Sequence, residues 1–487
     1  MDIYVQTSSV VSKNAAVSSD KPAATQIGID ILKRGGNAAD AAVATMVAVS
    51  VLQPMTCGPG GDCHCIFYRK KDKKVMTING SGRTGKNATL EKVREARIMN
   101  LMTKESCKHG LWVSVPGAMA SIVKIIEEFG SGKLTLKDIL GPAIHLAEGG
   151  VPIPFKSGNC WNVFQHKFLH SKNANDLLID GRAPKPGQRH HGIMRNFVIP
   201  QLQERGSLQD IIFTFDGSPP HIDRHNVADS GPGAFYMGVT AQNIVAAVQE
   251  AGGALTEEDM KEHLLNPPNP VPDEALSIDF NGVTIWEMRP NTIGIVALVI
   301  FNILKGYDIR GLGHNSPDYI HLVVEATKLA YREAWEYLCD PKCCSKRMEE
   351  ILTEECAQKL RKKIDPESAY RCHQPFLGGN SSYVAAVDRE GNACSFICSI
   401  CSYFGSGIIP EDCGFAMHDR AKSMSLEEGN TNTFGPNKLP LHSNMPAIVT
   451  ETGTNDLLAV LGVIGRWMQP QGQVQKRDPI DTYPVTV

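Results

Sequence analysis

The sequence predicts an α+β fold, in which helices alternate with short strands that hairpin turns connect. Two features carry this prediction. Apolar side chains recur at helical spacing in several segments, beginning with Pro22 to Lys33. Elsewhere, apolar runs flank residues that favour tight turns, as on either side of Asn281-Gly282. No internal repeat or low-complexity tract interrupts this alternation over the 487 residues of the chain.

The first two helices follow from their start and stop signals. The helix predicted from Pro22 to Lys33 ends at Gly35-Gly36, and Asn37 is suited to cap a second, Ala-rich helix from Ala38 to Leu52. Pro54 then ends the second helix. Its small side chains allow another helix or a sheet to approach closely.

Two hairpins are predicted. Residues 63–68 and 75–78 form strands around the charged turn 69–74. Residues 276–280 and 283–287 form strands around Asn281-Gly282, which is a strong hairpin turn.

The remaining elements complete the expected organisation. Residues 100–265 are expected to be mostly helical, except for a polar stretch rich in His, Pro and Gly at 156–233, which is expected to be loop-like. Residues 367–379 are expected to form an exposed linker. Helices are predicted at 136–147, 239–251, 293–304 and 319–337, and strands at 383–387, 394–398, 447–450 and 457–462.

Composition narrows the class of protein. A hydrophobic content of 42% and a charged content of 21% are typical of a globular chain with a large core. The net charge of −3 and the lack of a basic run argue against a nucleic-acid partner. The first residues have neither a basic nor an apolar region typical of a secretory signal, and no apolar run is long enough to span a membrane. A cytoplasmic protein is therefore expected.

The 14 cysteines are expected to be free thiols in a reducing compartment. Cys63 and Cys65 alternate along a predicted strand, which places both thiols on one face. Cys398 and Cys401 form a Cys-x-x-Cys, which is compatible with zinc binding or redox chemistry. Zinc sites usually need a second pair at defined spacing, and a redox motif needs a βαβ context. Idle or buried thiols are therefore the preferred interpretation, and no metal site is predicted.

The most informative segment is Gly379 to Ala393, where two hydroxyl residues, Ser381 and Ser382, precede a short apolar strand. A hydroxyl at the start of a strand is where N-terminal-nucleophile hydrolases carry out their chemistry. Cleavage of the chain before such a residue frees an α-amine, which then acts as the base for the neighbouring side chain. Serines also flank strands without any such role, so the segment alone does not decide between the two interpretations.

Several blocks in order along the chain resemble the γ-glutamyltransferase (glutathione hydrolase) family, and most closely its soluble glutathione hydrolase-like branch. The matching blocks are residues 32–44, 58–62, 113–117, 313–316, 404–408 and 468–472, together with Gly282 and Pro290-Asn291. The resemblance implies a four-layer αββα sandwich. It also implies self-cleavage between Asn380 and Ser381, followed by hydrolysis or transfer of γ-glutamyl groups through a γ-glutamyl-enzyme intermediate, without a cofactor.

The resemblance assigns a role to individual positions. Ser381 stands where the family has its nucleophilic threonine, and Gly465 and Arg466 occupy the turn whose N–H groups form the oxyanion hole. Arg83 matches the arginine that binds the substrate α-carboxylate, for which a guanidinium fork is well suited. Asp419 stands in the segment that recognises the α-amine. His442 and Ser443 fall near the substrate-pocket hydroxyls of the family.

The chain also departs from the family pattern. Serine replaces threonine at 381, Ala385 replaces a serine, and Arg466 replaces the second glycine of the oxyanion turn. The resemblance divides the chain into a large-subunit region (1–380), a small-subunit region (381–475) that stays associated with it, and an unrelated tail (476–487). These departures keep an alternative open: a catalytically degenerate, uncleaved member with a binding or regulatory role.

Overall fold

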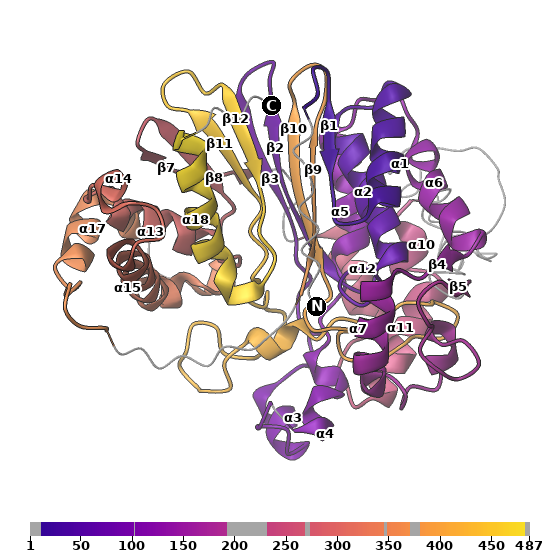
Figure 1. The fold of residues 1–487 in the computed structure, drawn as a ribbon. Helices are drawn as coiled ribbons and strands as arrows, with labels where there is room; N and C mark the ends of the chain where they lie inside the picture. The colour runs from indigo at the N-terminus through magenta and orange to yellow at the C-terminus, as the bar shows by residue number, and fades with distance from the viewer. Residues whose placement is uncertain are drawn as a thin grey trace.

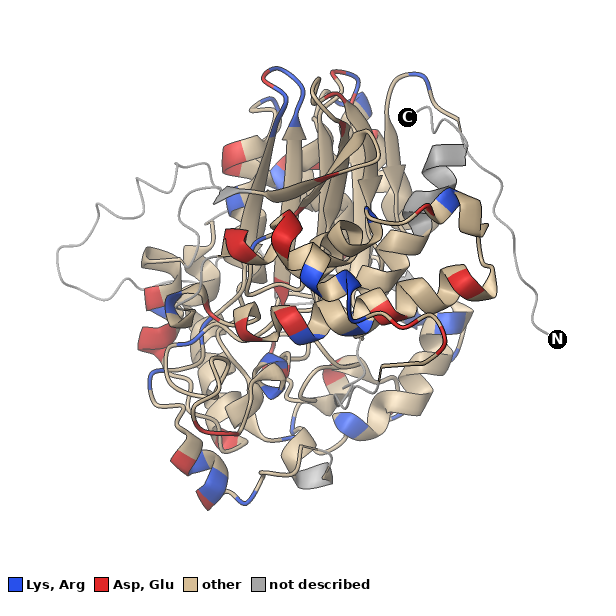
Figure 2. Cartoon of the chain, turned by 90° about the vertical axis from the view of Figure 1, so that its left-hand side faces the viewer, with Lys and Arg blue, Asp and Glu red and all other residues tan. Residues whose placement is uncertain are grey.

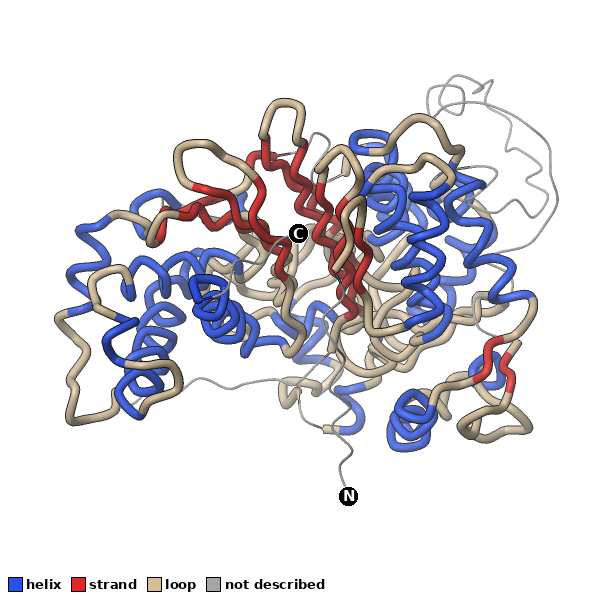
Figure 3. The backbone as a smooth tube through the Cα atoms, turned by 45° about the horizontal axis from the view of Figure 1, so that its top comes forward, coloured by secondary structure: helices blue, strands red, loops and turns tan. Residues whose placement is uncertain are grey.

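A computed structural model describes residues 11–101, 103–191, 231–267, 273–344, 348–370 and 380–482 of the chain. Two β-sheets lie side by side, with one group of helices outside each sheet (Figure 1). The view from the top of the molecule shows the same four layers in the order helices, sheet, sheet, helices (Figure 3). The predicted α+β class and the four-layer αββα arrangement are therefore confirmed.

The larger sheet has the strand order β1-β9-β10-β2-β3-β6. Each pair of neighbouring strands in it is antiparallel. Helices α1 and α2 pack on one another, and α2 and α5 pack against this sheet. The bounds are β1 Ala16–Ser18, β2 Asp62–Arg69, β3 Lys74–Gly80, β6 Asp273–Glu274, β9 Ser382–Val387, β10 Ala393–Ser399, α1 Pro22–Lys33, α2 Ala38–Leu52, α5 Ala118–Phe129 and α6 Leu136–Glu148.

Helix α2 is buried along its whole length, because its small side chains let the sheet approach on one side and α1, α5 and α6 on the others. The predicted cap is present: the Asn37 side chain accepts hydrogen bonds from the backbone N–H groups of residues 39 and 40, and Asp40 completes a capping box. Asp388, in the turn between β9 and β10, accepts the N–H of Ala38 at 3.0 Å. This contact ties the strand that follows Ser381 to the start of α2.

The smaller sheet has the antiparallel order β12-β11-β8-β7 and packs on α13, α15 and α18. Helix α13 is apolar on all sides and is buried throughout. The bounds are β7 Leu276–Phe280, β8 Val283–Glu287, β11 Ala447–Glu451, β12 Leu457–Leu461, α13 Gly294–Leu304, α14 Ile309–Leu312, α15 Pro317–Ala334, α16 Met348–Ile351, α17 Glu354–Arg361 and α18 Gln469–Thr482. Helix α18 continues past residue 475, where the sequence resemblance ends.

The β7–β8 hairpin has the predicted bounds, and Asn281 and Gly282 take positive φ values of 50° and 85° in its turn. Between the two sheets, Ile66, Tyr68 and Ile448 form part of a separate apolar core. The remaining elements are α3 Leu90–Glu95, α4 Lys104–Cys107, α7 Phe155–Phe164, α10 Gly233–Tyr236, α11 Val239–Glu250, α12 Glu257–Leu265, β4 Val151–Pro152 and β5 Arg189–His190.

The expectation of a loop-like stretch at 156–233 is wrong in its first part, because residues 155–164 form α7. The buried ring of Trp161 packs against Phe404, and this tertiary contact anchors the helix despite its polar composition. Residues 192–230, half of the expected loop, and residues 371–379, most of the expected linker, lie outside the described residues.

Surface charge is mixed in the view of Figure 2, where Lys and Arg alternate with Asp and Glu over the helices that face the viewer. Within the described parts of the chain, every helix is too short or too polar to cross a bilayer. The cysteines placed by the structure are all free thiols, and the Sγ atoms of Cys65 and Cys394 lie 3.5 Å apart across the larger sheet.

Candidate active site

Ser381 directly precedes β9, which lies between β1 and β10 in the larger sheet. Its side chain is buried, with 1% of its surface exposed. The hydroxyl donates a hydrogen bond to Asn444 Oδ1 at 3.1 Å, and Asn444 Nδ2 lies 3.0 Å from His64 Nδ1. The two contacts hold the amide of Asn444 between its neighbours, and thereby fix the direction of the Ser381 hydroxyl.

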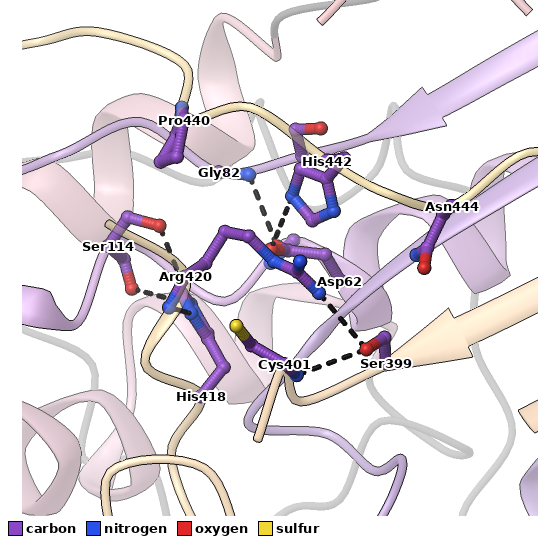
Figure 4. A network of polar contacts seen from close by, with 12 residues as sticks. Asp62, Gly82, Ser114, Ser399, Cys401, His418, Arg420, Pro440, His442 and Asn444 are labelled. Atoms are coloured by element: carbon purple, nitrogen blue, oxygen red, sulfur yellow. Dashed lines mark hydrogen bonds and ion pairs between the residues drawn. The ribbon is translucent and has the colours of Figure 1, made fainter. Parts of the chain in front are cut away.

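Both backbone polar groups of Asn380 are hydrogen-bonded, and its carbonyl belongs to the peptide bond between residues 380 and 381. The Asn380 N–H donates to the Cys401 carbonyl at 3.2 Å, and the Asn380 carbonyl accepts a hydrogen bond from Ser399 Oγ at 3.1 Å. Ser399 Oγ in turn accepts from the Cys401 N–H and from Arg420 Nη2, each at 3.0 Å (Figure 4). Because Ser399 accepts two hydrogen bonds, one of them from a cation, its own hydroxyl is a strengthened donor to the carbonyl.

A second buried group surrounds Asp62, the first residue of β2, which directly follows the glycines of the Gly-rich turn. Its Oδ1 accepts the N–H groups of Gly82 and Gly117 at 3.2 and 3.0 Å, and its Oδ2 lies 2.9 Å from His442 Nε2. Burial opposes ionisation of this carboxyl, but His418, His442 and Arg420 outweigh it and hold the pKa of Asp62 below its ordinary value. Asp62 therefore stays ionised near neutral pH.

The buried histidines of the site are neutral near pH 7. Burial, reinforced by the charge of Arg420, lowers the pKa of His442 to about 4. Burial also lowers the pKa values of His64 and His418. His418 Nε2 lies 3.1 Å from the Ser114 carbonyl, and its Nδ1 accepts the backbone N–H of Arg420 at 3.0 Å. The His418 ring therefore fixes the position of the Arg420 backbone.

Gly465 and Arg466, the predicted oxyanion turn, follow β12 and have φ values of 134° and 53°. Among the described residues, their N–H groups have no hydrogen-bond acceptor. The guanidinium of Arg466 is buried, and its Nη2 lies 3.2 Å from Cys401 Sγ and 3.4 Å from Ser402 Oγ. Since Cys401 also contacts Asn380 and Ser399, the structure brings this turn to the same loop that holds the peptide bond at 380–381.

Asp419, predicted to recognise an α-amine, has both carboxylate oxygens engaged. Oδ1 accepts the Ser402 N–H at 3.0 Å, and Oδ2 accepts Ser402 Oγ at 2.8 Å and Lys422 Nζ at 3.1 Å. Burial opposes ionisation, but Lys422, Lys167 and Arg466 hold the pKa of Asp419 well below its usual range. Its role in amine recognition stays a prediction.

Arg83, predicted to bind the substrate carboxylate, is largely buried and pairs with a carboxylate of the protein. Its Nη1 lies 2.5 Å from Asp340 Oδ2 and donates to the Asn437 carbonyl at 3.2 Å. Asp340 is also buried. Predicted pocket residues His442 and Ser443 are buried too, and the His442 N–H donates to the Asn291 carbonyl at 2.7 Å.

The sequence reasoning assigned no role to Ser399, Arg420, Asn444 and His64, although they contact the predicted nucleophile, its peptide bond or each other. Ser399 lies inside the Cys-x-x-Cys segment and His64 lies between Cys63 and Cys65, and in both places the sequence pattern points to the cysteines. These residues come from distant segments, so no spacing along the chain could connect them.

Comparison with known proteins places this geometry in a family. The gamma-glutamyltranspeptidase family matches residues 24–193 and 225–476 of the chain. The chain is 32% identical to the glutathione hydrolase-like YwrD proenzyme of Bacillus subtilis (strain 168) over 96% of its own length and 81% of that protein. It is 28% identical to the oxamate amidohydrolase proenzyme of Klebsiella pneumoniae, with coverage of 96% and 81%.

Among solved structures, cephalosporin acylase from Bacillus halodurans superimposes with a TM-score of 0.81 and 29% sequence identity, covering 100% of this chain and 85% of the other. The fold, the family match and the position of Ser381 at the start of a central strand agree with one another. The chain therefore belongs to the gamma-glutamyltranspeptidase family of hydrolase and transferase enzymes.

Proposed function

We propose that this chain cleaves itself before Ser381 and then hydrolyses or transfers the acyl group of γ-glutamyl amides, glutathione or a related compound among them. The supporting observation is the geometry at residues 380–381. The Ser381 hydroxyl is oriented by Asn444 at 3.1 Å, and the carbonyl of the preceding residue accepts a hydrogen bond from Ser399 at 3.1 Å. A nucleophile and a polarised carbonyl thus meet at one peptide bond.

Self-cleavage would proceed in two steps. Ser381 Oγ attacks the Asn380 carbonyl carbon, the bond to the Ser381 nitrogen breaks, and the hydroxyl proton passes to the departing amine. Water then hydrolyses the resulting ester, which leaves a carboxylate on Asn380 and a free α-amine on Ser381. Ser399 donates to the oxygen that becomes negatively charged in the first step, and Arg420 strengthens that donor.

Turnover would use the same side chain with a new base. The free α-amine of Ser381, whose ordinary pKa is about 7.7–8.0, takes the hydroxyl proton as Oγ attacks the substrate amide, and then gives it to the leaving amine. The N–H groups of Gly465 and Arg466 are proposed to stabilise the oxyanion. Water or an acceptor amine releases the γ-glutamyl group from Ser381.

The two fragments, 1–380 and the part from Ser381 onward, are proposed to remain together after cleavage. Strand pairing supports this. Strands β9 and β10 of the second fragment pair with β1 and β2 of the first fragment, respectively. A cytoplasmic location belongs to the same proposal and is supported by the free thiols of the described cysteines.

A gel and N-terminal sequencing test this proposal. The wild-type chain is expected to give two fragments, the smaller beginning Ser381-Ser382-Tyr383, and to release p-nitroaniline from γ-glutamyl-p-nitroanilide. Ser381→Ala should remain one uncut, inactive chain. Ser382→Ala is the matched control, because that buried hydroxyl contacts Thr56 at 2.8 Å rather than the cleaved bond, and it should still be cut. A smaller fragment that starts elsewhere would disprove the assignment of the nucleophile. One uncut wild-type chain would favour the binding or regulatory alternative.

A further inference from the structure

Arg420 is a buried cation that makes no direct ion pair among the described residues, although its charge acts at longer range on the buried Asp62. Its side chain is 2% exposed, its Nη2 donates to Ser399 Oγ at 3.0 Å, and its Nε has no hydrogen-bond partner. Among the described residues, no carboxylate oxygen lies within ion-pair distance of its guanidinium. Burial of a charge without a neutralising partner is strongly unfavourable. Such a group in a folded site indicates that an anion belongs beside it.

The charges around Arg420 show the same excess. Arg466 is also buried, makes side-chain contacts only with Cys401 Sγ and Ser402 Oγ among the described residues, and has an unpartnered Nε. Asp419 is already paired with Lys422. Asp62 is in contact with a histidine that is neutral near pH 7. Among the described residues, the buried cations of this site (Arg420, Lys422 and Arg466) therefore outnumber its buried carboxylates (Asp62 and Asp419). One added negative charge would be stabilised.

The excess charge lies next to the bond at which the chemistry takes place. Arg420 reaches Ser399, whose hydroxyl donates to the Asn380 carbonyl, and Figure 4 shows the guanidinium pointing toward Ser399 and Cys401. An anionic group on Arg420 would lie close to a carbonyl carbon attacked by Ser381. Arg83 is a weaker anchor by comparison, because Asp340 already neutralises its charge.

We propose that Arg420, rather than Arg83, binds a carboxylate carried by the acyl part of the substrate, and that the substrates are therefore amides of short dicarboxylic acids. This inference rests on the proposed function, because it concerns the same acyl-transfer site. The inference adds a substrate specificity. The carboxylate of Asp419 already has partners in the protein, and the site has a surplus of cations, so an α-amine on the acyl group is not required for binding. A glutaryl amide should then be accepted at least as well as a γ-glutamyl amide.

Matched substrates test the inference. Glutaryl-p-nitroanilide and butyryl-p-nitroanilide differ only in the terminal carboxylate. Arg420→Met should lower the ratio of kcat/KM for the glutaryl compound to kcat/KM for the butyryl compound about 10- to 100-fold, the range of a charge-assisted hydrogen bond. Values are normalised to the amount of cleaved chain, since Arg420 also contacts Ser399. Arg83→Met is the control and should leave the ratio of the two substrates unchanged. A selective loss of the glutaryl substrate in Arg83→Met, but not in Arg420→Met, would overturn the inference.

A binding measurement separates this inference from the proposed function. Glutarate should raise the midpoint of thermal unfolding of the wild-type chain, and Arg420→Lys should weaken that shift because it retains the charge but loses the planar fork. If neither anilide is hydrolysed but glutarate binds through Arg420, the proposed function fails and the carboxylate site stands. If glutarate does not bind to the wild-type chain, or binds equally well to both variants, the inference is wrong.

Discussion

Removal of the Ser399 hydroxyl should slow self-cleavage without unfolding the chain. Ser399 Oγ is the hydrogen-bond donor to the Asn380 carbonyl oxygen, at 3.1 Å, and this oxygen gains negative charge when Ser381 attacks. Loss of one such donor typically lowers a rate by about 10²–10³, or about 2.7–4 kcal/mol of activation free energy. Arg420 and the Cys401 N–H both donate to this hydroxyl and strengthen it as a donor. The rate of self-cleavage of Ser399→Ala should therefore be lowered by an amount near the upper end of this range.

Ser395→Ala provides the matched control. Ser395 lies on the same strand, β10, is equally buried, and its hydroxyl donates to the Leu461 carbonyl at 2.9 Å and contacts the Tyr383 hydroxyl. Each variant leaves buried hydrogen-bonding groups without a partner, so each should lose about 1–3 kcal/mol of stability. Only the Ser399 variant should be cut slowly.

The assay follows the fraction of cut chain on denaturing gels after a pulse of cell-free synthesis, with thermal unfolding measured in parallel. If Ser399→Ala is cut as fast as Ser395→Ala at similar stability, Ser399 does not activate the carbonyl. The assignment of the self-cleavage machinery would then fall, whatever the activity of the cleaved enzyme.

Other variants probe different parts of the site. Asn444→Leu removes the acceptor that orients the Ser381 hydroxyl and should slow cleavage about 5- to 10-fold, as a net hydrogen bond of about 1–1.5 kcal/mol implies; normal cleavage kinetics would refute this positioning role. Because Asp340 already pairs with Arg83, Arg83→Lys should leave KM for γ-glutamyl-p-nitroanilide nearly unchanged in a folded, cleaved variant; a rise of about 10-fold would show that Arg83 binds the substrate carboxylate, as the family resemblance implies. Burial lowers the pKa of His263 to about 4 from its ordinary value near 6.5, so the unfolded chain binds the proton more tightly and stability falls as pH drops from 6.5 toward 4. At pH 5 this histidine should cost roughly 2 kcal/mol, and denaturant titrations of His263→Gln should show a correspondingly flatter pH dependence.

The sequence by itself determined the local elements where the signal lies within a few residues. Asn37 predicts a helix start because its side chain caps the N–H groups directly after it, and Asn281-Gly282 predicts a hairpin because both residues accept positive φ. Ordered blocks of matching residues likewise sufficed for the family and the four-layer fold. The polar segment at 155–164 shows the limit: its helix depends on the burial of Trp161 against Phe404, which is distant in sequence.

The tertiary structure decided which side chains meet at Ser381. Asn444 contacts Ser381, Ser399 contacts the Asn380 carbonyl, and Arg420 contacts Ser399. These contacts form only because β9 and β10 pair and the segments at 400–402 and 418–422 fold back over the strand ends. Their contacts arise from the packing of two sheets, so no periodicity or spacing in the chain encodes them locally. The same packing pairs Arg83 with Asp340 but, among the described residues, brings no carboxylate into a direct ion pair with Arg420, although both are arginines near motifs of one family. Electrostatic pairing depends on distances of a few ångströms in the folded state, and only the tertiary structure sets those distances.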